Sequence, residues 1–519
     1  MENNIIKRLL GSEMAQKDRN FTKYSVERKD LLEQLSDPDN ELTIINSPRG
    51  SGKSGLLLSH AESLQSYSSQ YVVIKKFYEE VRFPEGDISI DRHVNFWLNT
   101  MLGWIVADIG SKKGIAIFED DISSVEFAEQ QGEKELNLIK SLLNRLKFKC
   151  LPFEKLDYDP QLNDRTFSRI INKSKSVYWL LLDEMDDLYD GSSYRNHSLV
   201  ALFQAASYIS GRIDNVKIRI SIRPHIYTFL KTNFDSIQKL RECVIDISWT
   251  EEQLKQILAR RIDFYECGTA DSNFEQLDLI PSNENHTSTN GNTDKIKKYF
   301  DDFDMSFTKG KTSNFRALHT ASMGRPRWMI ELCKIALQQE RYAEKASIDC
   351  FKLAFASYGE NRISFIAGEY KQMYPYIEAA INGIAGARRV CIGDSKGLRS
   401  LIKGRVINAR IVASADSASE DEISALALEV ANALYVVEFL RAKQDLGGGG
   451  KDHRFYTYQT RPSLLTSWNK ERNISWEIHP TFARGLNLID SGVYESAGQA
   501  RPFRKKKDDP LKKKDKDLE

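Results

Sequence analysis

Residues 47–54 read SPRGSGKS and lie between an apolar run at 42–45 (LTII) and an apolar helical pattern that begins at Gly55. This order of strand, glycine-containing loop and helix is typical of a loop that wraps a polyphosphate. Small residues let successive backbone N–H groups point inward, and the helix N-terminus adds partial positive charge. In such a loop Lys53 reaches the outer phosphates and the Ser54 hydroxyl takes a position on Mg²⁺. We therefore expect a nucleotide to be bound by Ser47, Pro48, Arg49, Gly50, Ser51, Gly52, Lys53, Ser54 and Gly55.

The loop departs from the usual pattern at its first position, where Ser47 stands in place of a glycine. The alternative interpretation is a simple glycine turn before a helix. The correct context on both sides favours the nucleotide-binding loop.

A second signal lies at residues 177–184, which read VYWLLLDE. Six apolar residues in a row suit a strand that is buried on both faces of a parallel sheet, and ligands bind at the carboxyl ends of such strands. Asp183 is then placed to hold the water shell of Mg²⁺, and Glu184 to orient or deprotonate an attacking water. The pair predicts ATP hydrolysis as well as ATP binding, whereas the acidic residues at 186–190 are expected to form a polar loop.

The next predicted strand, at 216–222, ends in polar residues beside the expected position of the γ-phosphate. Ser221 or Arg223 could sense that phosphate, and Arg223 is the stronger candidate because its fixed fork of donors suits a phosphate. The alternative, equally open, is that Arg223 pairs with one of the carboxylates at 186–190.

The pattern after the last predicted core strand, at 244–247, is helical. Thr250 is expected to cap a helix that runs to residue 262, and a turn from Gly324 to Arg327 opens another apolar helix. Residues 267–293, between these helices, are rich in Asn, Ser, Thr and Gly, and predict a surface insertion or flexible loop.

In this order the motifs resemble those of AAA+ type P-loop ATPases, closest to the STAND and origin-recognition-like branch and to bacterial ATPases of that style in anti-phage defence gene clusters. The resemblance covers residues 20–345, with a weaker similarity to residue 490. It implies that Pro326 packs near adenine and that Arg327 is the phosphate sensor of a helical lid, with Arg325 as the second candidate. The stretch before residue 177, including a long helical pattern at 126–148, departs from the family pattern.

Residues 346–500 show a different pattern, with a helix predicted at 423–440, four glycines at 447–450 and short strands at 454–458 and 474–480. Helices followed by a glycine turn and two strands suggest a winged helix, which similar ATPases carry after the lid. Wings bind DNA through phosphates or dock on proteins, and the near-neutral composition favours docking. Arg454, Arg461 and Arg472 are the candidate DNA contacts, and His479 is expected to be a packed histidine.

The predicted fold class is α/β, with a P-loop NTPase parallel-sheet core, a helical lid, and a helical and winged-helix C-terminal domain. A chain of 519 residues suits about three domains. We place an N-terminal helical lead-in at 1–40, the ATPase core with a helical insertion at 41–248, the lid at 249–345 and the C-terminal domain at 346–500. The basic tail at 501–519, with nine Lys or Arg against five Asp or Glu, is expected to be disordered.

Composition narrows the class of protein further. The chain is 41% hydrophobic with a net charge of +1, it has no apolar run near the ~20 residues of a membrane span, and it begins without a secretory signal, so we expect a cytoplasmic protein. Its six cysteines form no CxxC pair, which suggests reduced thiols. No nuclease, protease or deaminase constellation is visible.

The function predicted from sequence is that of an ATP-hydrolysing regulatory switch or assembly ATPase that uses Mg²⁺. It would form homo-oligomers or act with a separate effector protein in bacterial defence. The alternative is a nucleotide-gated DNA-binding or scaffold protein with little turnover.

Overall fold

The computed structural model describes residues 3–18, 20–65, 70–76, 89–112, 170–172, 176–270, 289–300, 314–339, 345–387, 389–412, 418–446, 453–468 and 473–488. Several sequence predictions fall outside these residues: the helix at 126–148, the four glycines at 447–450, Arg472 and the tail at 501–519.

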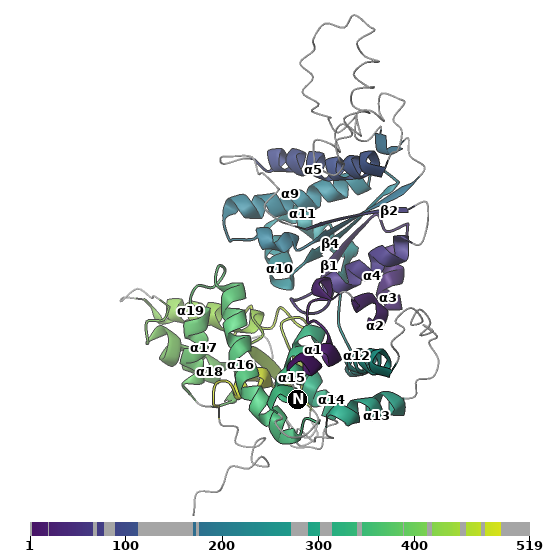
Figure 1. Ribbon diagram of the computed structural model, residues 1–519. Coiled ribbons are helices and arrows are strands. Elements are labelled where there is room, and N and C mark those ends of the chain that lie inside the picture. Colours follow the sequence, from purple (N-terminus) through teal and green to yellow (C-terminus); the bar gives the residue numbers. More distant parts are fainter. Residues whose placement is uncertain are drawn as a thin grey trace, which may run out of the picture.

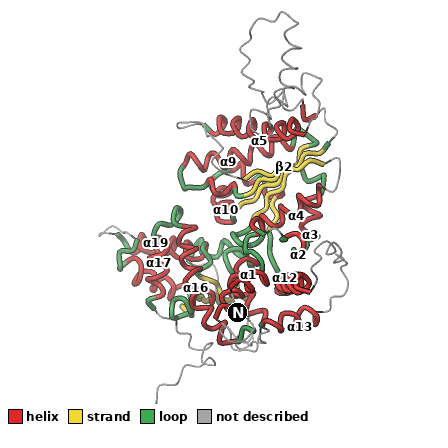
Figure 2. Tube along the Cα trace, viewed as in Figure 1, coloured by secondary structure: helices red, strands yellow, loops and turns green. Residues whose placement is uncertain are grey.

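A parallel five-stranded sheet forms the centre of the first part of the chain (Figure 2). Its strands are β1 (Leu42–Asn46), β2 (Gln70–Lys76), β3 (Val177–Asp183), β4 (Val216–Ile222) and β5 (Val244–Asp246). They lie in the order β2-β3-β4-β1-β5, and every neighbouring pair is parallel. The carboxyl ends of β1, β3 and β4 therefore meet at one edge of the sheet, which is where the predicted motifs begin.

Helices cover both faces of this sheet (Figure 1). Successive strand residues point to opposite faces: Leu180 packs with α5 (Ile90–Lys112) and α9 (Ser193–Ser210), whereas Leu181 packs with α3 (Lys29–Ser36) and α4 (Lys53–Gln65). The remaining described α-helices of this part are α2 (Phe21–Tyr24), α10 (Pro224–Asn233) and α11 (Asp235–Gln238). The three layers and the strand order are those of a P-loop NTPase core.

The helical lid follows the sheet and consists of α12 (Glu251–Ala270), α13 (Thr289–Tyr299), α14 (Asn314–Ala321) and α15 (Pro326–Gln339). The N-terminal helix α1 (Asn3–Leu10) packs into the lid core, although it is far away in sequence (Figure 1). The loop predicted at 267–293 is wrong at both ends, because 267–270 continue α12 and 289–293 open α13. Composition alone missed these turns, and the rest of the predicted loop, 271–288, lies outside the described residues.

The C-terminal part has the winged-helix order of helix, strand, two helices and an antiparallel sheet. After α16 (Ile348–Tyr370) come α17 (Ile377–Ala385), β6 (Cys391–Gly393), α18 (Ser395–Ile402), α19 (Glu420–Val436), β7 (Leu440–Asp445), β8 (His453–Tyr456), β9 (Ile474–Ile478) and α20 (Pro480–Ala483). The strands lie in the order β6-β9-β7-β8.

Two details of this part differ from the sequence prediction. The helix predicted at 423–440 ends at Val436, because Glu438 adopts a left-handed backbone (φ 58°) and Leu440 opens β7. The sheet has four described strands where two were expected. His479 is buried and caps α20 through a bond to Thr481, as expected for a packed histidine.

One long helix, α16, joins the lid to the winged helix. Its first half, including Phe351 and Phe355, belongs to the lid core, and Ile363 and Ile366 belong to the C-terminal core. The described residues contain no helix that is both long and apolar enough to cross a membrane.

Candidate nucleotide-binding site

The loop at 47–54 connects β1 to α4 and has the backbone of a phosphate-binding loop. Gly50 and Gly52 have φ of 86° and 96°, a region that favours glycine, so both positions need this residue type. Ser47 has no positive φ, so its backbone does not require the usual glycine. Its buried hydroxyl contacts Ser51, and its N–H donates to the Ile222 carbonyl (3.1 Å). The serine therefore fixes the start of the loop against β4.

Lys53 is the first residue of α4, and its side chain folds back over the loop. Its Nζ donates to the Ser47 carbonyl. Burial lowers the pKa of Lys53, and the nearby carboxylates of Asp186 and Asp183 oppose that effect. In the described residues the ammonium has a backbone partner and no ion pair, so it is positioned for an incoming anion.

Asp183 ends β3 and is held in one orientation. Its Oδ1 accepts hydrogen bonds from Ser221 Oγ (2.7 Å) and from the Glu184 N–H (3.1 Å). Ser221, on the neighbouring strand β4, is fully buried, and thus it orients the carboxylate rather than facing solvent. Glu184 has a left-handed backbone (φ 60°, ψ 23°), which is uncommon for a residue with a side chain. Such backbone outliers concentrate at functional sites.

Arg223 lies one residue beyond β4, and the structure shows the second of its two predicted arrangements. Its Nε is 3.0 Å from Asp186 and 3.5 Å from Glu369, and its Nη2 bonds to Asp187. Burial would lower the pKa of Arg223, but these three carboxylates raise it above the ordinary value. The expectation of a purely polar loop at 186–190 is also incomplete, because Asp186 is buried.

The lid turn separates the two candidate sensor arginines. Gly324 has a φ of 66°, and Pro326 opens α15. Arg327 lies against the loop, because its N–H donates to the Gly50 carbonyl (3.2 Å). Burial, followed by the neighbouring Arg49, lowers the pKa of Arg327. Arg325 instead points into the protein and forms a buried ion pair with Glu438.

A cavity opens beside the loop, between the lid and the N-terminal segment. Gly52, Gly55, Leu56 and Ser59 form its floor. The lid contributes Trp249, Ile257, Arg261 and Pro326, and the N-terminal segment contributes Phe21, Tyr24, Ser25, Val26, Glu27, Arg28, Leu31 and Leu32, with Ile247 completing the wall. The mostly apolar wall suits a small planar ligand.

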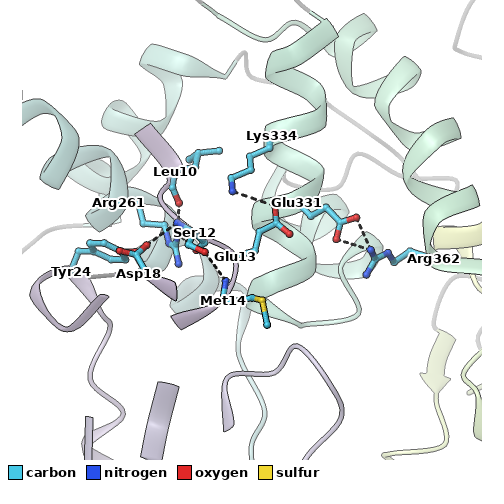
Figure 3. Close-up of polar contacts among 10 residues, drawn as sticks. All are labelled: Leu10, Ser12, Glu13, Met14, Asp18, Tyr24, Arg261, Glu331, Lys334 and Arg362. Atoms are coloured by element: carbon cyan, nitrogen blue, oxygen red, sulfur yellow. Dashed lines mark hydrogen bonds and ion pairs between the residues drawn. The ribbon is translucent and has the colours of Figure 1, made fainter. Parts of the chain in front are cut away.

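Arg261 of α12, which lines this cavity, joins the lid to the N-terminal segment through polar contacts (Figure 3). The guanidinium donates to the carbonyls of Leu10 and Ser12 and lies 4.9 Å from the ring centre of Tyr24, whose hydroxyl bonds to Asp18. Sequence reasoning missed Arg261 and Tyr24 in the cavity wall. Gly55, which was expected to bind the nucleotide, lies against the same segment, because a Cβ there would lie 2.7 Å from the Phe21 ring.

The same close-up shows two ion pairs that stiffen α15 (Figure 3). Lys334 contacts Glu13 at 3.2 Å, and Glu331 pairs with Arg362 of α16 at 2.5 Å. The lid helix is therefore tied to the N-terminal segment on one side and to α16 on the other.

Comparisons with known proteins give only loose similarities. No protein-family model and no curated protein matches the chain. Among solved structures, the Aeropyrum pernix ORC1 protein in complex with DNA is 12% identical, with 87% of this chain and 92% of that chain covered, at a TM-score of 0.35. The Aeropyrum pernix ORC2 protein in ADPNP–ADP complexes is 10% identical (91% and 96% covered, TM-score 0.39).

A third similar structure, Cdc6p from Pyrobaculum aerophilum, is 10% identical, with 94% of this chain and 96% of that chain covered, at a TM-score of 0.29. Because all three TM-scores are below 0.5, these similarities carry no argument. The P-loop assignment rests on the strand order and the loop geometry of this chain itself.

Proposed function

We propose that this chain is a Mg²⁺-dependent ATPase that works as a regulatory switch or assembly ATPase. The observation that carries the proposal is one juxtaposition. The left-handed glycines of the loop and Lys53 lie at the same sheet edge as the buried Asp183, with an apolar cavity next to Gly52. The triphosphate of a nucleotide, its bound metal and its base each have a matching place in this arrangement.

The proposed roles follow from chemistry and position. The loop N–H groups and Lys53 bind the phosphates, and Arg327 contacts them from the lid. Ser54 and Asp183 hold Mg²⁺, which neutralises charge on the phosphates when bound; the fixed orientation of the Asp183 carboxylate fits an oxygen ligand set that is completed by water. Glu184 orients or deprotonates the attacking water. Arg223 contacts the γ-phosphate once one of its present carboxylate partners yields.

The base would occupy the apolar cavity. Pro326 and Ile257 offer flat apolar contact from the lid, and Tyr24 and Val26 offer it from the N-terminal segment. This places adenine between parts of the chain that are more than 200 residues apart, so nucleotide binding would join them.

Two variants test the proposal. Lys53→Ala should abolish ATP binding in calorimetry while leaving the circular dichroism spectrum unchanged, because the loop contains no core packing to lose. Glu184→Gln should bind ATP and Mg²⁺ but lose hydrolysis, since an amide keeps the shape and cannot accept a proton. Unchanged ATP affinity in Lys53→Ala contradicts the site, and a normal rate in Glu184→Gln moves the catalytic role elsewhere.

A second candidate function is a nucleotide-gated DNA-binding or scaffold protein with little turnover. Arg454 and Arg461 both lie over Tyr456 in the wing, at 5.7 and 4.9 Å from the ring centre, and could meet phosphates. The helix in the recognition position, α19, reads EDEISALALEVANALYV, with four acidic residues and no Lys or Arg. That charge repels DNA, which favours docking on another copy of the chain or on an effector protein such as those of bacterial defence systems.

A further inference from the structure

The ATPase core, the lid and the C-terminal part meet in one buried polar cluster. Glu369, near the end of α16, reaches Arg223 of the core at 3.5 Å. The next residue, Tyr370, packs against His225 with ring centres 4.4 Å apart and ring planes tilted by 47°. Arg325 of the lid pairs with Glu438, which follows α19. The contacts of Glu369 and Tyr370 carry the C-terminal part directly onto the nucleotide edge of the sheet.

Glu369 is distinct among the acidic partners of Arg223. Asp186 and Asp187 follow β3 and belong to the core itself, so they stay beside Arg223 in any movement of the other parts. Glu369 comes from a helix whose end packs in the winged-helix core. Its side chain is 5% exposed and that of Arg223 is 13% exposed, so solvent screens this ion pair only weakly.

The carboxylate of Glu369 also lies in the electrostatic neighbourhood of Lys53, together with Asp183, Asp186 and Arg223. Lys53 is the residue proposed to meet the outer phosphates. A γ-phosphate placed there brings negative charge toward Glu369 and toward the same guanidinium that Glu369 contacts. Like charges brought together in a poorly screened site cost several kcal/mol unless one of them moves.

We propose that Glu369 competes with the γ-phosphate of ATP for Arg223, so that ATP, but not ADP, releases the end of α16 from the nucleotide site. The inference rests on the proposed ATP site and adds the residue through which the C-terminal part reads the nucleotide. ADP lacks the competing group and leaves the ion pair closed. Release of Glu369 would also loosen the Tyr370–His225 contact, because the two side chains are adjacent on α16.

The test measures ATP and ADP affinities by calorimetry with Mg²⁺ in the full chain, in a Glu184→Gln background to prevent turnover. Glu369→Gln removes the charge and keeps the shape, and Arg223 retains Asp186 and Asp187. We expect this variant to bind ATP about tenfold more tightly relative to ADP than the parent does. The matched control is Glu360→Gln, an exposed position on the same helix, which should leave the ratio unchanged.

Hydrogen exchange distinguishes the proposed competition from a purely structural role of Glu369. In the parent, ATP should increase exchange in the last turn of α16, around Glu369, and ADP should not; in Glu369→Gln that turn should exchange fast without nucleotide. Should Glu369→Gln fail to fold, Glu369→Asp keeps the charge but withdraws it by one methylene, and an intermediate ratio is expected.

The inference is overturned if the ATP-to-ADP affinity ratio of Glu369→Gln equals that of the parent. The same criterion applies to Glu369→Asp if that variant is needed. When the parent binds ATP and Lys53→Ala does not, an unchanged ATP-to-ADP ratio overturns this inference alone and leaves the proposed function intact. If the parent itself binds no ATP, both fail.

Discussion

At the scale of single residues, Gly50 combines a left-handed backbone with a close neighbouring side chain. Its φ of 86° is unfavourable for any side chain, and a Cβ would lie 3.2 Å from the Trp328 ring. Gly50→Ala should therefore lower the free energy of unfolding by about 1–2 kcal/mol, measured by urea denaturation.

The matched control for that variant is Gly368→Ala. This glycine lies inside α16, and an added Cβ would meet nothing within 4 Å. The Gly368→Ala substitution should stabilise the chain by about 0.5–1 kcal/mol, because alanine is more favourable than glycine inside a helix. A Gly50→Ala midpoint equal to that of the parent would contradict the close approach of Trp328 to the loop.

The position of a residue could be predicted where it depends on immediate neighbours in sequence. Lys53, Asp183 and Glu184 each stand at the end of a recognisable strand or loop, and the structure places them at one edge of the sheet. The contacts of Arg223 could not be decided from sequence between two interpretations. One of its partners, Glu369, is 146 residues away. Short-range spacing carries no information about such a contact.

At the scale of elements, the cap of α12 allows a direct test. Thr250 Oγ1 accepts from the Gln253 N–H (3.2 Å), and Gln253 Oε1 accepts from the Thr250 N–H (3.0 Å). Thr250→Ala should cost about 1 kcal/mol of stability, whereas Thr250→Ser keeps the hydroxyl and should restore most of it. Equal thermal midpoints for the alanine and serine variants would show that the cap contributes nothing.

The two arginines of the lid turn, Arg325 and Arg327, are expected to differ in what their substitution changes, stability or ATP hydrolysis. Arg327→Ala should reduce ATP hydrolysis with little change in stability, because its backbone N–H, which is unaffected, makes the contact with Gly50. Arg325→Ala should destabilise the chain by about 3 kcal/mol, since it leaves Glu438 buried without its partner. ATPase rates and urea midpoints for both variants test the assignment, and equal effects on both measurements would contradict it.

Elements with strong patterns were predicted close to their observed bounds, and short or charged ones were not. The apolar runs of β1, β3 and β4 left little choice, because each is buried on both faces. Strand β7 reads LRAKQD and carries two basic residues. Only its partners explain it: Arg441 pairs with Glu477 of β9 and lies 4.1 Å from the Phe455 ring centre.

At the scale of the whole molecule, any DNA binding should be carried by phosphate contacts. Retention on DNA should fall steeply with salt and show no sequence preference. Changing Arg454 and Arg461 together to alanine should lower the slope of log affinity against log salt by about 2, and deleting residues 501–519 should weaken binding without abolishing it. A chain that is not retained at low salt, with or without ATP, would remove this candidate function and leave protein docking.

Buried histidines couple the stability of the molecule to pH. Burial lowers the pKa of His60 to about 3, with Arg219 adding to the effect, and holds the pKa values of His225 and His479 well below the ordinary 6.5. Each is therefore neutral in the folded chain and becomes protonated on unfolding below pH 6.5. The unfolded state then binds more protons, so these histidines contribute stability above pH 6.5 that is lost as the pH falls toward 3.

The contribution of His60 can be isolated with His60→Gln. The ring is fully buried against Trp179, with centroids 5.2 Å apart, and Nδ1 lies 3.3 Å from Ser36 Oγ. At neutral pH the variant should be less stable, since the glutamine packs less well in this apolar site. As the pH falls below 6.5, the parent should lose up to about 1.4 kcal/mol per pH unit more than the variant, so the gap narrows. Urea unfolding followed by tryptophan fluorescence between pH 7.5 and 4.5 measures both curves. Parallel curves would show that His60 takes up its proton in the folded state as readily as in the unfolded one.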